Sequence, residues 1–361
     1  MLLDESGAVL AERRVETPLR APALFATFAA LVGELEAADP DPDSSSGDPM
    51  PVGFGLPGLV GPDGTLSSAP HLEGVANLAV LPALAALLPG RRLVVDNDAT
   101  AAAVAELGAG AARGARDVLV VTLGTGIGGA LVVDGAVRRG AHGFAGEIGH
   151  MVVDRDGLEC SCGQRGCWET LASGTALGLL AGRAVAEGAA PGLATRAEPG
   201  GAVRGEHVTE AAAGGDPGAM LVLRAFAEQV AIGLANLVLV TDPELVVLGG
   251  GPIGAGEVLL APLREALAAR LLPSWHRPEV PVLAAAHGER AGAVGAALLA
   301  GWAGTPATWA GTPATWAGTP AGPQGVPAGR AGDLPAGKAE LRAGSPPSSS
   351  PSGSGRRAPN P

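Results

Sequence analysis

The chain has 361 residues, of which 47% are hydrophobic and 17% are charged, and its formal net charge is −12. Such an acidic chain lacks the clustered Lys and Arg that nucleic acid or an anionic membrane requires of a main partner. The sequence has no run of eighteen apolar residues without a polar or glycine interruption, and the opening Met-Leu-Leu-Asp-Glu-Ser-Gly lacks the basic start and apolar core of a secretory signal. We therefore expect a globular, cytoplasmic protein with reduced thiols and a small-molecule substrate.

Strand-like and helix-like segments alternate along the chain. Residues 92–96 indicate a buried strand before an Ala-rich helix over 99–107, and a glycine turn separates predicted strands over 117–123 and 130–134. Further on, we expect a helix over 219–240, a strand over 244–248 and a helix over 258–271. This alternation predicts an α/β protein of two lobes with a cleft between them.

Two segments have the composition of unfolded chain. Residues 39–48, Asp-Pro-Asp-Pro-Asp-Ser-Ser-Ser-Gly-Asp, are predicted to be a solvated loop and not a metal site. From Trp302 the repeat Trp-Ala-Gly-Thr-Pro-Ala-Thr leads into a segment rich in Pro, Gly, Ala and Ser. Because it buries too little apolar area to offset its ordering entropy, residues 302–361 are predicted to be a disordered, dispensable tail.

All the cysteines lie in one short stretch. The spacing Cys-x-Cys-Gly-x-x-Gly-Cys brings Cys160, Cys162 and Cys167 together, and His150 precedes them. Three thiolates and one imidazole complete a tetrahedral shell, so we predict a structural zinc ion with no ligand position left for water. The alternative is that these residues are small buried hydrophobic side chains.

The glycine-rich stretch 124–129 follows one predicted strand and precedes another. This strand-turn-strand arrangement is neither the dinucleotide-binding loop of a Rossmann fold nor a P-loop. Bare backbone amides together with the Thr125 hydroxyl could nevertheless approach phosphate oxygens closely, which is our preferred interpretation. The alternative is a simple turn.

Three acidic residues are candidates for a polyol site. Asp98 follows a buried strand, where it could accept a proton from a hydroxyl group, although Asn97 or Asp98 could equally be an ordinary helix N-cap. Glu147 and Glu169 lie on either side of the predicted zinc ligands, so one metal would hold both in place. Ordinary surface glutamates are the alternative for these two residues.

Residues 143–150 and 160–174 give this chain a resemblance to the ROK family of repressors and sugar kinases, and above all to its bacterial glucokinases. The resemblance extends from about residue 52 to 299 and implies an actin/hexokinase-like fold of two ribonuclease-H-like lobes. We accordingly expect an N-terminal lobe over 1–107, a C-terminal lobe over 108–301 and the tail over 302–361. It also implies that the protein phosphorylates a hexose with ATP and Mg²⁺, and glucose is the first candidate substrate. Similar proteins are commonly homodimers.

The resemblance also implies roles for individual residues. By its position in the motif, Asp98 resembles the family's general base, which takes the proton from the sugar hydroxyl group. The expected sugar-binding residues are Gly58, Asn97, Glu147, His150 and Glu169. The expected zinc ligands are His150, Cys160, Cys162 and Cys167. The expected phosphate- and nucleotide-binding residues are Gly124, Thr125, Gly126, Gly128, Gly249 and Gly250.

The sequence departs from the family pattern in two places. Residues 71–75, His-Leu-Glu-Gly-Val, replace the usual sugar-side motif, which leaves N-acetylmannosamine, N-acetylglucosamine, mannose and fructose open as substrates. The family's first phosphate loop, Asp-x-Gly-Gly-Thr, has no counterpart, since residues 1–7 match only the end of its second strand. We therefore expect a truncated N-terminal lobe, and either a start upstream of Met1 or a catalytically impaired sugar-binding protein; no residues provide a repressor's helix-turn-helix.

Overall fold

The computed structural model describes residues 1–40, 49–69, 72–73, 75–197, 201–273 and 276–302. These residues all belong to one compact unit, Met1–Thr319. The predicted loop, apart from its first two residues, and the predicted tail, apart from Trp302, lie outside the described residues. Those expectations, and the division into lobes after residue 107, stay predictions.

The N-terminal part of the chain contains two strand pairs and a short meander. Strand β1 pairs with β2 in antiparallel fashion, whereas β3 and β7 are parallel, with Leu56 opposite Asn97. Strands β4, β5 and β6 form an antiparallel meander. The bounds are β1 Leu2–Leu3, β2 Val9–Ala11, α1 Ala21–Glu36, β3 Val52–Leu56, β4 Leu59–Val60, β5 Thr65–Ser68, β6 Ala76–Ala79, α2 Val80–Leu87, β7 Leu93–Asn97 and α3 Asp98–Ala109.

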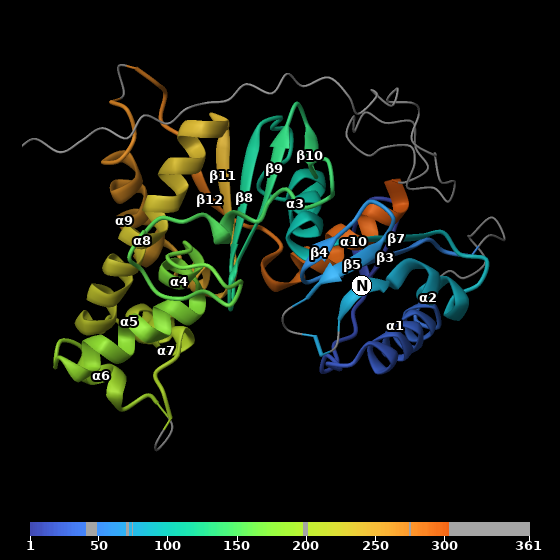
Figure 1. Cartoon of the computed structure of the whole chain (residues 1–361), viewed down its shortest axis with the longest axis horizontal. Coiled ribbons are helices and arrows are strands. Elements are labelled where there is room, and N and C mark those ends of the chain that lie inside the picture. The colour runs from blue at the N-terminus through green and yellow to red at the C-terminus, as the bar shows by residue number, and fades with distance from the viewer. Residues whose placement is uncertain (41–48, 70–71, 74, 198–200, 274–275, 303–361) are drawn as a thin grey trace, which may run out of the picture. The chain divides into compact units, whose positions relative to one another are not determined.

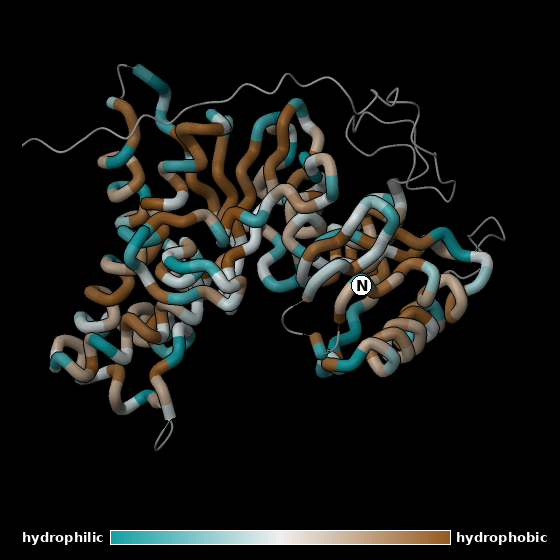
Figure 2. The backbone as a smooth tube through the Cα atoms, viewed as in Figure 1, coloured by the Kyte–Doolittle hydropathy of each residue, from teal (hydrophilic) through white to brown (hydrophobic). Residues whose placement is uncertain are grey.

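The C-terminal part is built around a five-stranded sheet with the order β10-β9-β8-β11-β12 (Figure 1). Its middle strand, β8, is an apolar run that lies between two neighbours, and Figure 2 shows the hydrophobic colouring of these strands. The strand bounds are β8 Val118–Leu123, β9 Ile127–Val133, β10 Ala136–Arg138, β11 Leu245–Gly249 and β12 Val282–Ala284. The helix bounds are η1 Ile148–His150, α4 Glu169–Ala172, α5 Gly174–Ala186, α6 Pro191–Ala194, α7 Gly205–Ala213, α8 Pro217–Thr241, η2 Gly251–Ala255, α9 Glu257–Ala268, η3 Gly288–Arg290 and α10 Ala291–Trp302.

The long helix α8 is the core helix of this C-terminal part. Asp216 caps it by accepting a hydrogen bond from the Ala219 N–H at 2.8 Å, and Asp242 ends it with a left-handed φ of 44°. Among the described helices, α8 is long and apolar enough to cross a membrane, yet 61% of its most apolar window is buried inside the fold. A mostly buried helix of this composition is typical of a protein core.

One detail of the glycine-rich stretch differs from the sequence prediction. Strand β9 begins at Ile127, three residues earlier than expected, so Gly128 and Gly129 lie in the strand and the turn consists of residues 124–126. A Cβ atom at Gly129 would collide with the Ile148 side chain. The two strand glycines therefore serve close packing, a requirement that composition alone does not distinguish from a turn.

Helix α10, the last described element, packs against the N-terminal elements β3 and α3 (Figure 1). The approach is backbone to backbone: a Cβ atom at Gly53 of β3 would collide with the carbonyl group of Ala296. A Cβ atom at Gly295 of α10 would likewise collide with the carbonyl group of Ala101 in α3. The N-terminal part is thus covered by a helix from the far end of the described chain.

Candidate active site

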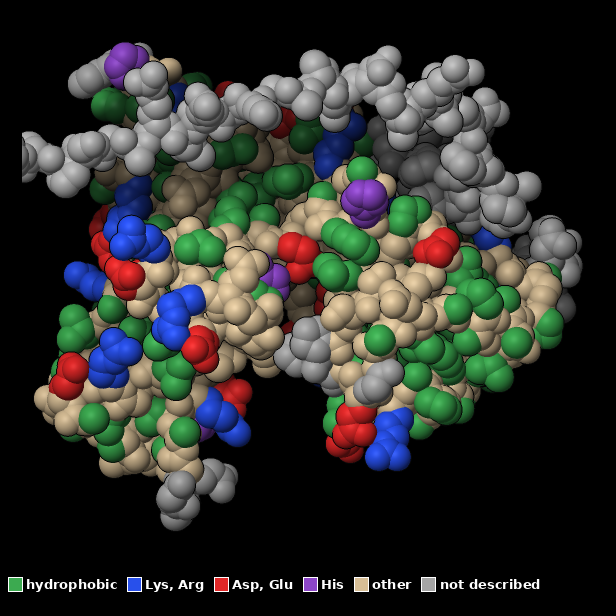
Figure 3. All heavy atoms as spheres, viewed as in Figure 1, with side chains coloured by type: hydrophobic (Ala, Val, Ile, Leu, Met, Phe, Trp, Pro, Cys, Tyr) green, Lys and Arg blue, Asp and Glu red, His purple; other side chains and the backbone are tan. Residues whose placement is uncertain are grey.

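A pocket of about 500 Å³ lies at the carboxyl ends of β7, β8 and β11. Such strand ends are where open α/β sheets bind ligands. In the face drawn in Figure 3, acidic and histidine side chains gather at a central hollow. The pocket is lined by every residue that sequence reasoning assigned to base, sugar and phosphate binding: Gly58, Asn97, Asp98, Gly124, Thr125, Gly126, Gly128, Glu147, His150, Glu169, Gly249 and Gly250.

The end of β7 carries two polar residues with different contacts. The N-cap of α3 is Asn97, whose side-chain oxygen accepts from the Thr100 N–H at 3.0 Å while its amide donates to the Gly58 carbonyl at 3.1 Å. Asp98 is the first residue of α3, and its Oδ1 accepts from the Ala99 N–H at 2.8 Å. The capping alternative therefore applies to Asn97, while Asp98 lies in the first turn of the helix.

The residue before this pair is held by a buried ion pair. Asp96 accepts two hydrogen bonds on Oδ2 from Arg139, at 2.9 Å from Nε and 2.7 Å from Nη2, and its Oδ1 accepts from the Asn97 N–H. The two side chains are only 12% and 9% exposed, for Arg139 and Asp96 respectively. The pair fixes the strand end that presents Asn97 and Asp98.

The turn over 124–126 is held in place by side chains from two later helices. The Thr175 hydroxyl donates to the Thr125 carbonyl at 2.7 Å, and the Glu169 carboxylate accepts from the Ile127 N–H at 2.9 Å. A Cβ atom at Gly126 would collide with that same carboxylate. Glu169 therefore connects the cysteine-containing segment to the glycine turn, a contact that its predicted sugar-binding role did not include.

The residue directly after β11 is a glycine for a similar reason. Gly250 has a φ of +98°, and a Cβ atom there would collide with the carbonyl group of Leu123 at the end of β8. The backbone groups that follow β8 and β11 thus lie side by side at one wall of the pocket. Bare backbone of this kind can approach phosphate oxygens closely.

Glu147 and His150 belong to the short helix η1 and its N-cap, which pack against β9. Desolvation raises the pKa of Glu147, the nearby His150 opposes this, and the carboxylates of Asp98 and Glu169 add to the upward shift. His150 uses its two ring nitrogens in two directions: Nε2 lies 3.8 Å from the Glu147 carboxylate and Nδ1 lies 3.6 Å from the Cys160 sulfur. One imidazole therefore connects the acidic pocket with the cysteine cluster.

The cysteine cluster has the dimensions of a zinc shell. The candidate ligand atoms of His150, Cys160, Cys162 and Cys167 all lie within 4.8 Å of one another, and the sulfur atoms of Cys162 and Cys167 are 3.7 Å apart. Tetrahedral Zn–S bonds of about 2.3 Å place sulfur atoms about 3.8 Å apart, which matches. Burial raises the pKa of Cys167 to about 12, whereas the Gln164 N–H lowers the pKa of the exposed Cys162. The donor set and its spacing fit zinc.

Trp168 anchors this segment to the core. Its ring is fully buried, and its Nε1 donates to the Gln229 carbonyl of α8 at 3.0 Å. The ring rests on Gly233, where a Cβ atom would collide with it. The segment from His150 to Glu169 is thus fixed to α8 directly after its last cysteine.

Sequence reasoning missed a second pocket and a buried acid. The second pocket, of about 930 Å³, shares Gly124 and Thr125 with the first and extends along α5 past Gly174, Gly178 and Gly182. Their four-residue spacing puts all three on one helix face, a signal that could have revealed this wall.

The missed acid is Glu106, which is fully buried at the edge of the first pocket. Its carboxylate accepts from the N–H groups of Ala111, Ala286 and His287 at 2.8 to 3.0 Å. It joins α3 to the segment after β12. In the sequence, the signal for this buried acid is a single Glu within an Ala-rich helix.

The fold and the pocket together define a class of α/β proteins that bind ligands between strand ends and glycine turns. Residues 1–302 match the model of the ROK family, and the chain belongs to this family. Its α/β architecture is accordingly the ROK, actin/hexokinase-like fold.

Individual relatives agree with this assignment. The chain is 35% identical over 303 residues to a glucokinase of Streptomyces coelicolor, covering 83% of this chain and 92% of that protein. It is 36% identical over 250 residues to an N-acetylmannosamine kinase of Citrobacter koseri, covering 69% and 79%. The crystal structure of a ROK family glucokinase from Streptomyces griseus, in complex with glucose and AMPPNP, matches with a TM-score of 0.72 at 37% identity, covering 82% of this chain and 94% of that one.

Proposed function

We propose that this protein is an ATP-dependent hexose kinase and that glucose is its preferred substrate. One observation carries the proposal: a single pocket brings Asp98 together with Glu147, His150 and the glycine turn over 124–126. A carboxylate base, polar hydroxyl-binding groups and bare backbone amides are the parts that phosphoryl transfer to a sugar needs. The similar kinases from Streptomyces support the choice of glucose.

In the proposed reaction, the Asp98 carboxylate accepts the proton of a sugar hydroxyl group. The hydroxyl oxygen attacks the γ-phosphorus of ATP, the bond from that phosphorus to the bridging oxygen breaks, and ADP leaves. The amides of residues 125 and 126 and of Gly250 hold the phosphates in line with the sugar, since the Gly124 amide already donates to the Gly126 carbonyl at 2.9 Å. Mg²⁺, bound together with ATP, would neutralise part of the negative charge of the phosphates.

The second pocket is the proposed site for the nucleoside part of ATP. It continues from the glycine turn, so a triphosphate held at the turn would extend its ribose and base along α5. Of the three glycines, Gly182 has open space around it, whereas Gly174 and Gly178 lie close to the backbone carbonyls of Gly124 and Val203. Sequence reasoning placed nucleotide binding only at the two glycine turns.

Zinc is proposed as a structural ion. His150, Cys160, Cys162 and Cys167 would hold it, and all four ligand positions would be filled by protein. Its contribution is to fix His150 and, through the neighbouring Glu169, the glycine turn. Oligomerisation to a homodimer is likewise part of the proposal.

Two narrower alternatives follow from particular observations. The similarity to an N-acetylmannosamine kinase keeps N-acetylated hexosamines as candidate substrates. The second alternative is a sugar-binding protein without kinase activity. The observation that favours it is that, within the described residues, β3 has a hydrogen-bonded neighbouring strand on one edge only. Such a protein would bind sugar but give no turnover.

The test is a coupled assay of ADP release with glucose, mannose, fructose, N-acetylglucosamine and N-acetylmannosamine. We expect the highest kcat/KM with glucose, together with a phosphate ester in the product. Calorimetry with each sugar separates the alternatives: sugar binding without ADP release would establish the impaired protein, and neither binding nor turnover would refute the proposal.

A further inference from the structure

Thr122 is a polar residue near the end of an apolar run on the middle strand β8. Its side chain is half-buried and lines the first pocket. On the same face of β8, Val118 and Val120 belong to the buried cluster that includes residues of α3 and α10. Valine and threonine have the same branched shape, so valine at residue 122 would satisfy the packing equally well. The hydroxyl group of Thr122 therefore needs another explanation.

Both neighbours of Thr122 across the sheet are glycines. Its register partners are Gly128 in β9 and Gly249 in β11. Residues paired in register project from the same face of a sheet, so no side chain flanks Thr122 on either neighbouring strand. The row leaves the Thr122 side chain open to the pocket at the carboxyl end of β8.

The hydroxyl group of Thr122 is directed toward the start of α3. A Cβ atom at Gly128 would lie 2.7 Å from Thr122 Oγ1 and 2.9 Å from the Cβ atom of Ala99, so both groups border one small space. A Cβ atom at Gly249 would instead lie 3.8 Å from the Thr122 methyl carbon. The methyl group thus faces β11, and the hydroxyl group faces the side of the pocket where Asp98 precedes Ala99.

No described residue forms a hydrogen bond with the Thr122 hydroxyl group. Two other threonine hydroxyls near the site are occupied. Thr175 donates to the Thr125 carbonyl at 2.7 Å, and Thr170 donates to the Cys167 carbonyl at 2.8 Å. A hydroxyl group that is open to a pocket and has no such partner can donate to a ligand.

The lining of the first pocket offers phosphate groups no full positive charge from Lys or Arg among the described residues. Its ionisable side chains are His150 and five acids. The acids are Asp98, Glu106, Glu147, Glu169 and Glu289. Apart from the Mg²⁺ that accompanies the nucleotide, phosphate oxygens in this pocket depend on N–H and O–H donors. Each hydroxyl donor therefore matters more than it would beside a Lys or Arg side chain.

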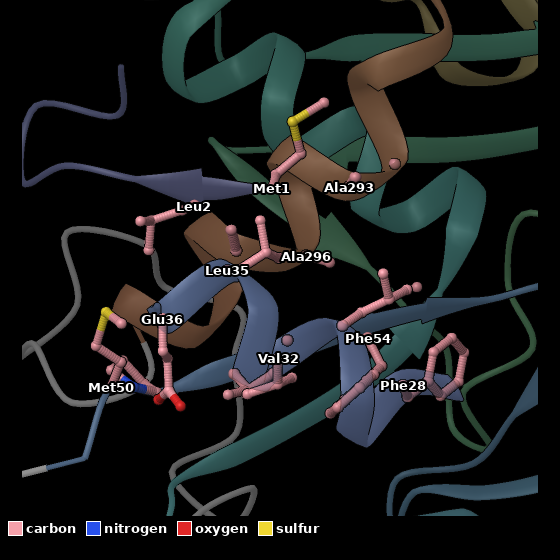
Figure 4. Close-up of a pocket in the computed structure, with 17 residues that line it drawn as sticks. Met1, Leu2, Phe28, Val32, Leu35, Glu36, Met50, Phe54, Ala293 and Ala296 are labelled. Atoms are coloured by element: carbon pink, nitrogen blue, oxygen red, sulfur yellow. The ribbon is translucent and has the colours of Figure 1, made fainter. Parts of the chain in front are cut away.

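A neighbouring cavity lacks such donors. Gly292 of α10 lines the first pocket and also this cavity, whose volume is about 330 Å³. Figure 4 shows its apolar lining, which includes Phe28 and Val32 of α1. Glu36, the charged side chain in its described lining, is paired with Arg91, and no Ser or Thr contributes to that lining. Of these two cavities, only the first pocket can bind a phosphate group through a hydroxyl.

We propose that the Thr122 hydroxyl group donates a hydrogen bond to the terminal phosphate of the bound nucleotide. In the proposed reaction this phosphate lies between Asp98, which takes the sugar proton, and the glycine turn, which begins two residues after Thr122. The hydroxyl group keeps its proton throughout and offsets charge on an oxygen of the transferred group. The inference rests on the proposed function and adds a side-chain donor to the backbone donors.

The test compares AMPPNP with ADP, both with Mg²⁺, because only AMPPNP carries a third phosphate group. By calorimetry, Thr122→Val should weaken AMPPNP binding about 10- to 100-fold, since a hydrogen bond to a charged group is lost, and leave ADP affinity within about twofold. We expect kcat with glucose to fall by a similar factor. Thr122→Ser keeps the hydroxyl group and should keep AMPPNP affinity within about threefold of the original value.

The melting temperature separates this role from packing. Valine fits beside Val120, so Thr122→Val should melt at the same or a higher temperature. A packing role would lower the melting temperature and weaken both nucleotides equally. Thr241→Val is the matched control, because its hydroxyl donates within α8 to the Leu237 carbonyl, and it should leave both affinities unchanged.

Two failures are distinguishable. If the unmodified protein phosphorylates glucose and Thr122→Val binds AMPPNP as tightly as it does, the inference is overturned while the kinase proposal stands. If the unmodified protein binds neither nucleotide, both are overturned. Equal weakening of ADP and AMPPNP in Thr122→Val would also overturn the inference, since the contact would then not be with the third phosphate.

Discussion

Asp98 and Asn97 are adjacent in sequence, but their side chains have different partners. The Asn97 side chain accepts a hydrogen bond from the N-terminal turn of α3 and donates one to the Gly58 carbonyl. Asp98 occupies the first helical position, beside the pocket. Because the cap is supplied by Asn97, a change of Asp98 can remove a carboxylate without removing the cap. This separation makes the proposed base testable.

Asp98→Asn is expected to lower kcat by at least about 100-fold while leaving the sugar dissociation constant within about twofold of its original value. The amide keeps the shape of the side chain but accepts no proton. Steady-state kinetics and calorimetry with glucose measure the two quantities. Near-normal turnover in this variant would exclude Asp98 as the base.

The adjacent residues Arg138 and Arg139 provide a matched comparison of exposed and buried ion pairs. Arg139→Ala leaves Asp96 buried without its cation and should lower the free energy of unfolding by about 3 to 5 kcal/mol. Arg138 pairs with Asp134 at 3.8 Å with both side chains largely exposed, so Arg138→Ala should cost no more than about 1 kcal/mol. Denaturant unfolding of both variants provides the comparison, and equal losses would contradict a special role for the buried pair.

At the scale of elements, the segment from His150 to Glu169 has little regular structure, and the proposed zinc would be what holds it in place. We expect one zinc per chain by elemental analysis, and loss of both zinc and sugar binding on treatment with a chelator. Cys162→Ser should reproduce the loss, whereas Arg155→Ala, in the same segment with its side chain 93% exposed, should retain the metal.

Acid should also release this zinc. Burial raises the pKa of the Cys167 thiol to about 12, so zinc has to displace the thiol proton and its affinity should fall as the pH falls. Zinc retention measured across a pH series tests this direction. A normal metal content in Cys162→Ser would contradict the proposed ligand set.

Regular elements with strong patterns were predictable from the sequence. Helix α8 was expected over 219–240 and extends over Pro217–Thr241, and β7 was placed within one residue. The two-residue strands β1 and β4 are too short to give a periodic signal. The contact between Glu169 and the glycine turn was equally hidden, because it depends on how two distant segments pack.

At the scale of the whole molecule, α10 connects the end of the described chain to its beginning. Gly295→Ala places a methyl group against the Ala101 carbonyl of α3 and should destabilise the fold by about 1 to 3 kcal/mol. Gly301 in the same helix has open space around it, so Gly301→Ala should be neutral or slightly stabilising. Thermal unfolding measures the difference in stability between the two variants. Equal melting temperatures would argue against tight packing of α10.

The same helix also imposes an order on events during protein synthesis. Strand β3 ends at Leu56, but α10, which covers it, begins only at Ala291. At about 5 to 20 residues per second, a ribosome needs roughly 12 to 47 s to produce the intervening chain. Throughout that interval the glycine face of β3 that α10 covers lacks its partner, as does α3 once it is made, while α1 and α2 can already pack on the other face of β3. We therefore expect the nascent chain to bind chaperones that recognise exposed apolar segments until α10 has been synthesised.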